Sequence, residues 1–446
     1  MEDIFMKYFN RWVISFLVIG LVIYGCSPGL VNLVNDYSLY SLRKQLIYLS
    51  GTLAFCMMTL AVILAARFSF VNKLLKGLDK AYLVHKSAGI FCLFFIIIHW
   101  LLKKAPHWLK DFYVIARPAN SGRRGSSSAF EVYLINLGNT MVDYIFYVVV
   151  ALIVIALVFK LSYKLFRLTH KLFPLAYLFV AYHAATIQLR GEWFKTPSGF
   201  LLTLLVLVGS VCACIALLQR IGHRRKTTAT IEEISLQNDC VMVLKLMLSK
   251  SVNYQAGQFV FLTFEHSSEP HPFSIISFDG NQGTMHFAIK FLGDFTQAIR
   301  TVLAVGQTVT VEGPYGELTF NDDATRHLYI AGGIGITPFI TQLSQLAHDE
   351  SDRHIALWYC AKGELSQQFP HNLATICQQA QVDLHYINSL VKNDLLEQLE
   401  QCIAQNEKGL SIWFCGPESL LDAIKGLLKR KNISATCLHC DHFNMR

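Results

Sequence analysis

Charged residues are scarce in this sequence, and they are unevenly placed. Asp, Glu, Lys and Arg make up 16% of the 446 residues, against about 25% in a typical soluble protein. The deficit lies in residues 1–222, which hold nearly all the long apolar runs, whereas residues 227–446 carry charges every few positions. This contrast excludes a wholly soluble protein and predicts a membrane part followed by a water-soluble head.

A regular cysteine framework is also missing. The 12 cysteines are scattered through apolar and polar stretches without a repeated spacing, which argues against a disulfide-stapled secreted domain. Cys437 and Cys440 form a C-x-x-C pair, and because no second pair completes a zinc site we interpret them as structural. The first apolar run lacks an A-x-A-type cleavage site, so we expect it to remain as a span.

No basic stripe lies on a predicted folded face, which argues against nucleic-acid binding despite the formal net charge of +8. Lys and Arg cluster instead at the ends of apolar runs, as in RFSFVNKLLKGLDK, KLSYKLFRLTHK and RIGHRRK. Cytoplasmic loops of membrane proteins favour positive charge. We therefore expect a multi-pass protein of the cell's inner (plasma) membrane, in contact with membrane lipid, with its head in the cytoplasm.

Six stretches have the length of a membrane span, which needs about 20 mostly apolar residues. They cover roughly residues 10–27, 45–67, 82–102, 142–160, 168–188 and 198–219. We therefore predict a membrane α-helical bundle of six transmembrane helices over residues 1–222. The polar stretch 103–141 is expected to be a long loop between the third and fourth spans.

The head shows two successive patterns. Residues 227–323 give short alternating strands separated by turns, which predicts an antiparallel β-barrel. Residues 324–446 give apolar strands such as HLYIAG and HIALWYC that alternate with helical stretches. This second pattern is typical of an α/β domain with a parallel, Rossmann-like sheet.

Two predicted spans each carry a pair of histidines, His85 with His99 in the third span and His170 with His183 in the fifth. The two spacings are nearly equal, and each separates its pair by about 20 Å along a helix. Two parallel spans could therefore hold two iron porphyrins, one between His85 and His170 and one between His99 and His183. Bis-histidine ligation fills both axial positions of iron and favours electron transfer.

The geometry of the second pair is imperfect. The interval from His85 to His99 returns to within about 40° of the starting face of a helix, but the shorter interval from His170 to His183 ends about 220° away. Pro174 lies within the fifth predicted span and could kink it. The alternative for any single intramembrane histidine is a hydrogen-bonded core residue, and this alternative stays open here.

These segments resemble a known family. LDKAYLVHK with His99, and THKLFPLAYLFVAYH, are similar to the haem-binding spans of the ferric reductase and NADPH oxidase superfamily. Residues 227–446 are similar to its ferredoxin–NADP reductase-type head, so that the resemblance covers about residues 40–446. It implies FAD in the barrel, NADPH (or NADH) in the α/β domain and two haem b groups in the membrane.

Two motifs of the barrel carry the resemblance to FAD-binding proteins. In HPFSIIS, the family's flavin-binding strand, the resemblance assigns cofactor contacts to His271, Pro272, Phe273 and Ser274, with Ser274 also catalytic. In IKFLGDFTQAI it implies that Gly293 and Thr296 bind the FAD pyrophosphate, because a glycine and a helix start favour an anion.

The α/β domain resembles the family's NADPH-binding part at four places. HLYIAGGIGITPFI runs from a strand through glycines into a helix, which suits a pyrophosphate. Ala361 stands where the family's oxidases have an arginine that pairs with the 2′-phosphate, and Lys362 follows one position later as the charge expected to serve that phosphate. The resemblance also assigns catalytic roles to Cys415, near the nicotinamide, and to Phe443, over the flavin. The complete set of expected cofactor contacts in this domain is Gly332, Gly333, Gly335, Thr337, Pro338, Lys362, Cys415, Gly416, Pro417 and Phe443.

The resemblance implies an enzyme, a flavocytochrome that moves electrons from cytoplasmic NADPH through FAD and two haems to an acceptor on the far face. The acceptor is expected to be O2, giving superoxide, or a ferric chelate; protein partners are not predicted. Arg43 and Lys103 are candidates for a cation near the acceptor, or else ordinary interfacial side chains. One alternative is a haem-containing conduit that reduces a periplasmic redox protein or a quinone. A nucleotide-regulated channel or transporter is another, although it would need neither the four histidines nor HPFSIIS.

Overall fold

The computed structural model describes two compact units. One comprises Met6–Leu75 and Lys80–Ile221, and the other comprises Gly222–Arg446 with Met1–Phe5 and Lys76–Asp79. The structure describes residues 2–446 except 28–37, 76, 109–127, 159–162, 190–194, 238, 266, 268, 317, 319, 321, 323, 348–353, 364–368, 389–393, 406–409 and 441–446. We refer to the first unit as the membrane unit and to residues 222–446 as the head.

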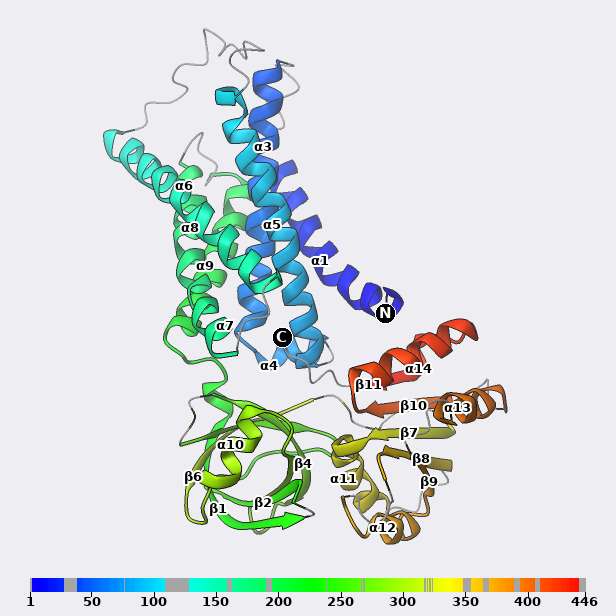
Figure 1. Cartoon of the computed structure of the whole chain (residues 1–446). Helices are drawn as coiled ribbons and strands as arrows, with labels where there is room; N and C mark the ends of the chain where they lie inside the picture. The colour runs from blue at the N-terminus through cyan, green and yellow to red at the C-terminus, as the bar shows by residue number, and fades with distance from the viewer. Residues whose placement is uncertain are drawn as a thin grey trace. The chain divides into compact units, whose positions relative to one another are not determined.

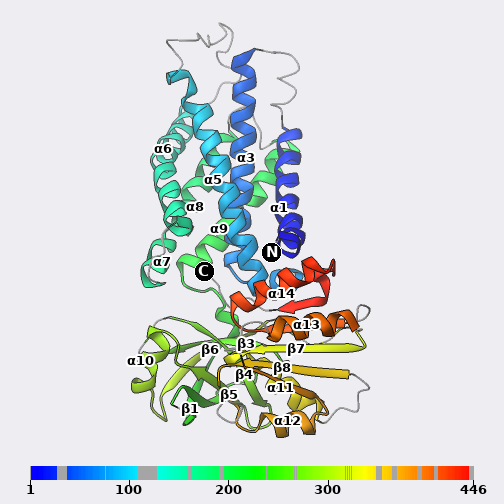
Figure 2. The same ribbon diagram turned by 45° about the vertical axis from the view of Figure 1, so that its right-hand side comes forward.

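The membrane unit is helical, and its long helices run alongside one another (Figures 1 and 2). A buried tyrosine, Tyr177, joins three of them: its hydroxyl lies 3.0 Å from the Thr59 hydroxyl and donates to the Leu205 carbonyl. The helices are α1 (Glu2–Gly25), α3 (Leu39–Ala65), α4 (Ser69–Leu75), α5 (Leu78–Trp108), α6 (Ala129–Val158), α7 (Tyr163–His170), α8 (Phe173–Ile187) and α9 (Pro197–Leu217).

The number of helices long enough to span a membrane differs from the prediction. In the described part of the chain, four are long and apolar enough: Leu39–Ala65, Leu78–Pro106, Ala129–Val158 and Pro197–Leu217. The shorter apolar stretch Arg11–Gly25 belongs to α1, and α8 has 15 residues. Because a helix of that length covers about 22 Å against about 30 Å of hydrocarbon, the prediction of six transmembrane helices is not confirmed.

Helix α6 begins well before the predicted span, within the stretch 103–141 that we expected to be a loop. A capping box explains this start: the Ser128 hydroxyl accepts from the Glu131 N–H at 3.2 Å, and the Glu131 carboxylate accepts from the Ser128 N–H at 3.0 Å. These two bonds satisfy backbone donors that the first turn leaves open. The motif SAFE signals this start in the sequence, and our prediction missed it.

The predicted fifth span is broken into α7 and α8. Lys171 and Leu172 form a turn between the two helices, and Pro174 occupies the first turn of α8 rather than a helix interior. Proline is tolerated there because the first turn leaves its N–H positions unbonded. His170 and His183 therefore lie on two different helices. The angle of about 220° expected for one continuous helix does not apply to this pair.

The first part of the head is a closed six-stranded barrel, as predicted. Its strands are β1 (Lys226–Gln237), β2 (Val241–Leu248), β3 (Phe259–Phe264), β4 (His271–Asp279), β5 (Thr284–Lys290) and β6 (Thr308–Tyr315). They pair antiparallel in the order β1-β2-β5-β4-β3-β6. Inward side chains such as Leu244, Val260 and Phe287 fill the barrel, together with Ile299 of α10 (Asp294–Val302).

The second part of the head is a parallel sheet covered on both faces (Figure 1). The strand order is β9-β8-β7-β10-β11, so the order in which the chain adds strands reverses between β7 and β10. Alternate strand residues bury against α11 and α12 on one face and α13 and α14 on the other. The elements are β7 (Arg326–Gly332), α11 (Thr337–Leu346), β8 (His354–Ala361), α12 (Leu373–Gln379), β9 (Asp383–Asn388), α13 (Asp394–Gln405), β10 (Leu410–Cys415), α14 (Glu418–Arg430) and β11 (Leu438–Cys440).

The C-x-x-C pair lies at the last strand of this sheet. Cys437 precedes β11 and Cys440 ends it, and both pack against the apolar core beneath α14. Burial raises the pKa of the Cys437 thiol, which disfavours the reactive thiolate. These features agree with the structural interpretation of the pair.

Candidate functional site

The two histidines of α5 are anchored in the same way. The Nδ1 atom of His85 lies 2.9 Å from the Ala61 carbonyl oxygen, and the Nδ1 atom of His99 lies 2.9 Å from the Ile47 carbonyl oxygen. A carbonyl can only accept, so Nδ1 carries the proton in each ring and Nε2 has a free lone pair. This is the tautomer that presents Nε2 as a metal ligand.

The acceptors on α3 repeat with the spacing of the histidines. The interval from Ile47 to Ala61 equals the interval from His85 to His99, and the two helices run in opposite directions at these contacts. In an α-helix the residue four positions on lies beside a given carbonyl. Here that residue is Gly51 or Ala65, so a small side chain leaves each carbonyl open. A Cβ at Gly51 would lie 2.9 Å from the His99 Nδ1 atom.

His85 and His170 come together in the structure. Their ring centroids are 5.9 Å apart, which is close to the separation of about 6 Å for two imidazoles that each bind one metal at about 2 Å. The rings of Phe166 and Phe173 contact the His170 ring, with centroids 4.9 and 4.8 Å away. The predicted inner pair therefore has the spacing of a bis-histidine site with an aromatic surround.

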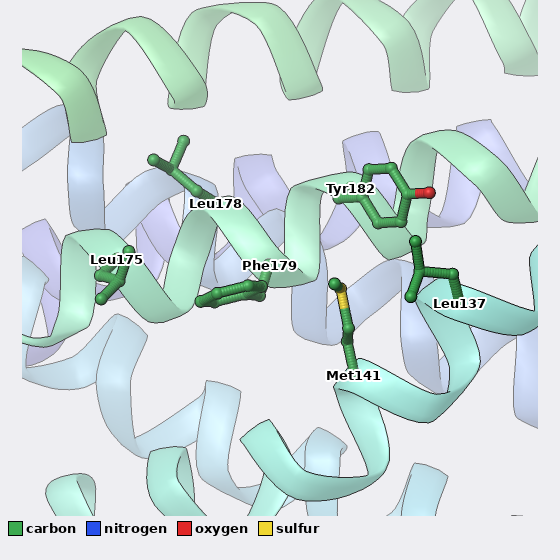
Figure 3. Close-up of a pocket in the computed structure, with 6 residues that line it drawn as sticks. All are labelled: Leu137, Met141, Leu175, Leu178, Phe179 and Tyr182. Carbon is green, nitrogen blue, oxygen red and sulfur yellow. The ribbon is translucent and has the colours of Figure 1, made fainter. Parts of the chain in front are cut away.

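His183 lies on α8 where α6 approaches closely. A Cβ at Gly138 of α6 would lie 2.7 Å from the Thr186 hydroxyl and 3.5 Å from the His183 Cα atom, so only glycine permits this distance. The same two helices, α6 and α8, line a largely open apolar cavity of about 300 Å3 (Figure 3), formed by Leu137, Met141, Leu175, Leu178, Phe179 and Tyr182. His183 is not one of its lining residues, and the pairing of His183 with His99 stays a prediction.

The two candidate cations near His99 are engaged by the chain itself. Lys103 donates to the Asp143 carboxylate of α6 at 2.6 Å, and Arg43 donates to the Leu102 carbonyl at 3.0 Å. They therefore link α3, α5 and α6 close to His99. The half-exposed ion pair between Lys103 and Asp143 contributes little to stability, so both contacts serve mainly to position the helices.

In the head, the segment HPFS has strand pairing on one side only, which leaves a local open edge in the otherwise closed barrel. Residues 271–274 pair with β3, while β4 pairs with β5 over Ile275–Asp279. Pro272 has no N–H to donate and suits such an edge. His271 stacks on Phe295 of α10, with ring centroids 3.4 Å apart, and its Nε2 lies 3.8 Å from the Glu269 carboxylate. The structure thus brings the first two predicted motifs together.

Gly293 and Thr296 build the start of α10. The Thr296 hydroxyl accepts from the N–H groups of Leu292 and Gly293 at 2.9 and 3.0 Å and donates to the Gly293 carbonyl at 3.1 Å. A Cβ at Gly293 would meet no atom within 4 Å, and its φ of −138° suits any residue. Neither packing nor backbone geometry requires glycine here, which leaves room for a ligand as the reason.

The glycines of GGIGITP pack against the end of β10. A Cβ at Gly332 would lie 2.5 Å from Pro417 Cδ, and one at Gly335 would clash with the Cys415 carbonyl. Gly416 also abuts Gly332, with its Cβ position 3.0 Å from the Gly332 Cα atom. These contacts hold the glycine loop directly beside the end of β10.

The rest of this loop leads into α11. Gly333 has a φ of +56° and faces open space. The Thr337 hydroxyl donates to the Ile334 carbonyl at 3.1 Å, and Pro338 lies in the first turn of α11. The loop therefore turns sharply at a glycine before the helix begins.

The predicted nucleotide contacts share one edge of the parallel sheet. Gly332 ends β7, Lys362 follows the end of β8, and Cys415 ends β10. In open α/β sheets, ligands bind at the carboxyl ends of the strands where the strand order reverses, and here that point lies between β7 and β10. The Thr341 hydroxyl of α11 donates to the Ile275 carbonyl of β4 at 2.8 Å, which ties this edge to the barrel. Phe443 lies outside the described residues.

Comparison with known proteins fits this geometry. Residues 50–181 match a ferric reductase like transmembrane component, residues 227–319 match an FAD-binding domain, and residues 308–437 match the N-terminal domain of a dimethylamine monooxygenase subunit DmmA-like family. Ferric reduction oxidase 7, chloroplastic, of Arabidopsis thaliana is 32% identical over 219 residues, covering 43% of this chain and 27% of that protein. The chain is thus similar to the ferric reductase and NADPH oxidase superfamily.

Two other relatives resemble this chain. The putative respiratory burst oxidase homolog protein G of Arabidopsis thaliana is 28% identical over 211 residues, covering 42% of this chain and 24% of that protein. The carnitine monooxygenase reductase subunit of Escherichia coli (strain K12) is 27% identical over 198 residues, covering 44% and 56%. The chain thus spans about half or less of the length of these relatives.

The residues that orient the histidines were not predicted from the sequence. Ile47, Ala61 and Gly51 lie on a different helix from the rings they hold. The sequence does contain a signal for them. A small residue, Gly51 or Ala65, follows each accepting residue by four positions, and these two small residues are separated by the same interval as His85 and His99. Helix α3 therefore belongs to the site as much as α5 does.

Proposed function

We propose that the chain is a transmembrane oxidoreductase that moves electrons from NADPH to an acceptor on the opposite face of the membrane. The observation that carries this proposal is the pairing of His85 with His170, at 5.9 Å between ring centroids. The anchoring of His85 through Nδ1 makes Nε2 the metal ligand. Its repetition at His99 supports a second site about 20 Å further along α5.

Each cofactor has residues that fit it. His85 and His170 would hold one haem, and His99 and His183 a second. Bound FAD and haem would supply the change from a two-electron hydride to single electrons. The FAD would lie at the open edge formed by residues 271–274 and the start of α10, where Gly293 leaves space. NADPH would lie at the carboxyl edge of a Rossmann-like sheet, along Gly332–Pro338 and Cys415–Pro417.

The chain's own residues have three tasks. Carbonyls of α3 fix the tautomer and orientation of the α5 histidines. The apolar side chains of α3, α5, α6 and α8 exclude water, so that an electron carrier is held in a low-dielectric surround. The packing of Gly332 and Gly335 against Cys415 and Pro417 holds the nucleotide loop beside the strand end that would face the nicotinamide.

The charges of the chain support one orientation in the membrane. Lys and Arg at the ends of α3, α6 and α9 favour a head in the cytoplasm of a bacterial cell, with the membrane unit in the inner membrane. Lys362 supports NADPH, since lysine serves as a point charge for phosphate, while NADH is the alternative. For the acceptor we favour O2 or a ferric chelate.

Purified protein tests the proposal in two steps. The pyridine haemochrome spectrum, taken per chain, should give two haem b groups, and a haem-free protein would refute the proposal. NADPH-driven reduction of cytochrome c in air is then measured with and without superoxide dismutase. Loss of signal with the dismutase identifies O2 as the acceptor; a persisting signal means direct reduction and directs the search to ferric chelates, quinones or redox proteins.

A further inference from the structure

Helix α7 has three distinct faces. One face carries Phe166 and, one turn later, His170. The His170 ring contacts the rings of Phe166, of Phe173 at the start of α8, and of its partner His85. A second face carries leucines at intervals of three and four positions, and the third carries two cations, Arg167 and Lys171. These cations lie one turn apart because the Lys171 N–H bonds the Arg167 carbonyl at 3.2 Å. The exposed leucines are Leu165, Leu168 and Leu172, with Leu168 exposed to 65%.

Helix α4 has a similar composition at the same end of the membrane unit (Figure 1). Phe70 and Leu74 are exposed to 68% and 61%, and Lys73 between them is exposed as well, whereas Val71 and Leu75 are buried. The stretch 159–172 contains no acidic residue, and neither does 66–76. Short helices with exposed apolar residues beside cations lie in the plane of the membrane–water interface.

The charge of these helices selects the partner. A cation close to the surface of an anionic membrane gains favourable energy from the negative surface potential, and this gain is absent on a zwitterionic surface. Exposed leucines and phenylalanine alone would suit any lipid. The cations beside them favour lipids with a negatively charged headgroup.

The orientation of His170 depends mainly on α7, whereas the orientation of His85 is also fixed by a neighbouring helix. His85 is fixed by the hydrogen bond to Ala61, whereas the Nδ1 atom of His170 is buried without a hydrogen-bond partner among the described residues. The rings of Phe166 and Phe173 pack against the His170 ring and set its position. Because Phe166 and His170 both belong to α7, a shift of this short helix moves His170 directly.

We propose that α4 and α7 form a binding surface for anionic phospholipid, and that headgroups bound by Arg167 and Lys171 hold α7, and with it His170, in place. The binding surface stands on the exposed residues and charges. Its effect on the histidine pair rests on the proposed haem function. The lipid is thus a positioning partner of the inner site, with no part in electron transfer itself.

Lipid binding is tested on the full chain in detergent. Native mass spectrometry counts retained phosphatidylglycerol and phosphatidylcholine, and thermal unfolding is followed as each lipid is added. The variant R167Q/K171Q is compared with the matched control K429Q/R430Q, which removes one Lys and one Arg exposed on α14. We expect wild type and control to retain and be stabilised by phosphatidylglycerol selectively. The R167Q/K171Q variant should retain it about 30-fold more weakly.

Three outcomes overturn the lipid surface: equal effects of the two lipids, undiminished binding by R167Q/K171Q, or equal protection by inorganic phosphate, which would make the site one for a free anion.

The effect of bound lipid on His170 is measured in nanodiscs with and without phosphatidylglycerol. There the reduction midpoint of one of two haems should shift with the lipid in wild type and control but not in R167Q/K171Q, and a lipid-independent midpoint in wild type refutes the coupling. Absence of haem would refute the proposed function while leaving the lipid-binding result intact.

Discussion

Replacing Gly51 by alanine puts a methyl group into the space that the His99 ring occupies. The new Cβ would lie 2.9 Å from Nδ1 and 3.0 Å from Cε1, so the ring must retreat by about half an ångström to reach ordinary contact. The hydrogen bond from Nδ1 to the Ile47 carbonyl, now 2.9 Å, would then lengthen past the normal range of about 2.7–3.2 Å.

The energies of this change oppose one another. Losing the bond costs about 1 kcal/mol and the overpacked contact about 1–3 kcal/mol, while alanine in a helix returns about 1 kcal/mol relative to glycine. The net destabilisation is therefore modest, about 2 kcal/mol, and the protein should still fold. The His99 ring, however, loses its anchor, so we expect the G51A variant to bind one haem firmly and the second weakly or not at all.

The assay is the haem content per chain together with the thermal unfolding of the purified variant. G25A is the matched control, because a Cβ at Gly25 would meet no atom within 4 Å and this glycine ends α1, a helix without a proposed haem ligand. We expect the control to keep two haems. Two haems with a wild-type spectrum in G51A would refute the anchoring role of α3, and loss of haem in both variants would show that the effect is not specific to His99.

Four other substitutions test separate parts of the protein. H170A should remove the inner haem, and two haems retained in this variant would refute the ligand assignment. G335A, whose Cβ would clash with the Cys415 carbonyl, should destabilise the head by about 3 kcal/mol or more in a thermal unfolding scan. G293A, which meets no atom, should leave stability unchanged and raise the dissociation constant of FAD; unchanged FAD affinity would contradict our interpretation of this glycine. Burial, and then Lys245, lower the pKa of His286 in the head, so the folded head disfavours its protonation. Stability should therefore fall as the pH drops below about 6.5, and H286Q should flatten that decline in pH-dependent unfolding measurements.

The sequence predicts the order of the structural parts because each has a local signal. Alternating apolar residues identified the barrel strands, and the glycines after HLYIA identified the loop between β7 and α11. The histidine spacing identified His85 and His170 as partners, which the structure places together. These signals depend on residues within one element or at a fixed interval.

Other features depend on contacts between distant elements, which no local pattern encodes. The bond from His99 to Ile47 joins two helices, and the stack of His271 on Phe295 joins a strand to a helix. The break before Pro174 changed the phase of the second histidine pair in a way that spacing alone did not predict. The capping box at Ser128 is a local signal present in the sequence, and our prediction did not consider it.

The matched interval on α3 and α5 limits how these helices can change in length. Inserting one residue between Ile47 and Ala61 would turn one carbonyl about 100° away from its histidine, and a shift on α5 alone would do the same. Only a compensating change in both helices would keep both anchors, because a full extra turn in one helix restores the face but moves the carbonyl about 5.4 Å along the axis. The lengths of α3 between Ile47 and Ala61 and of α5 between His85 and His99 are therefore coupled. Length variation in this protein should be confined to the segments outside residues 47–61 and 85–99.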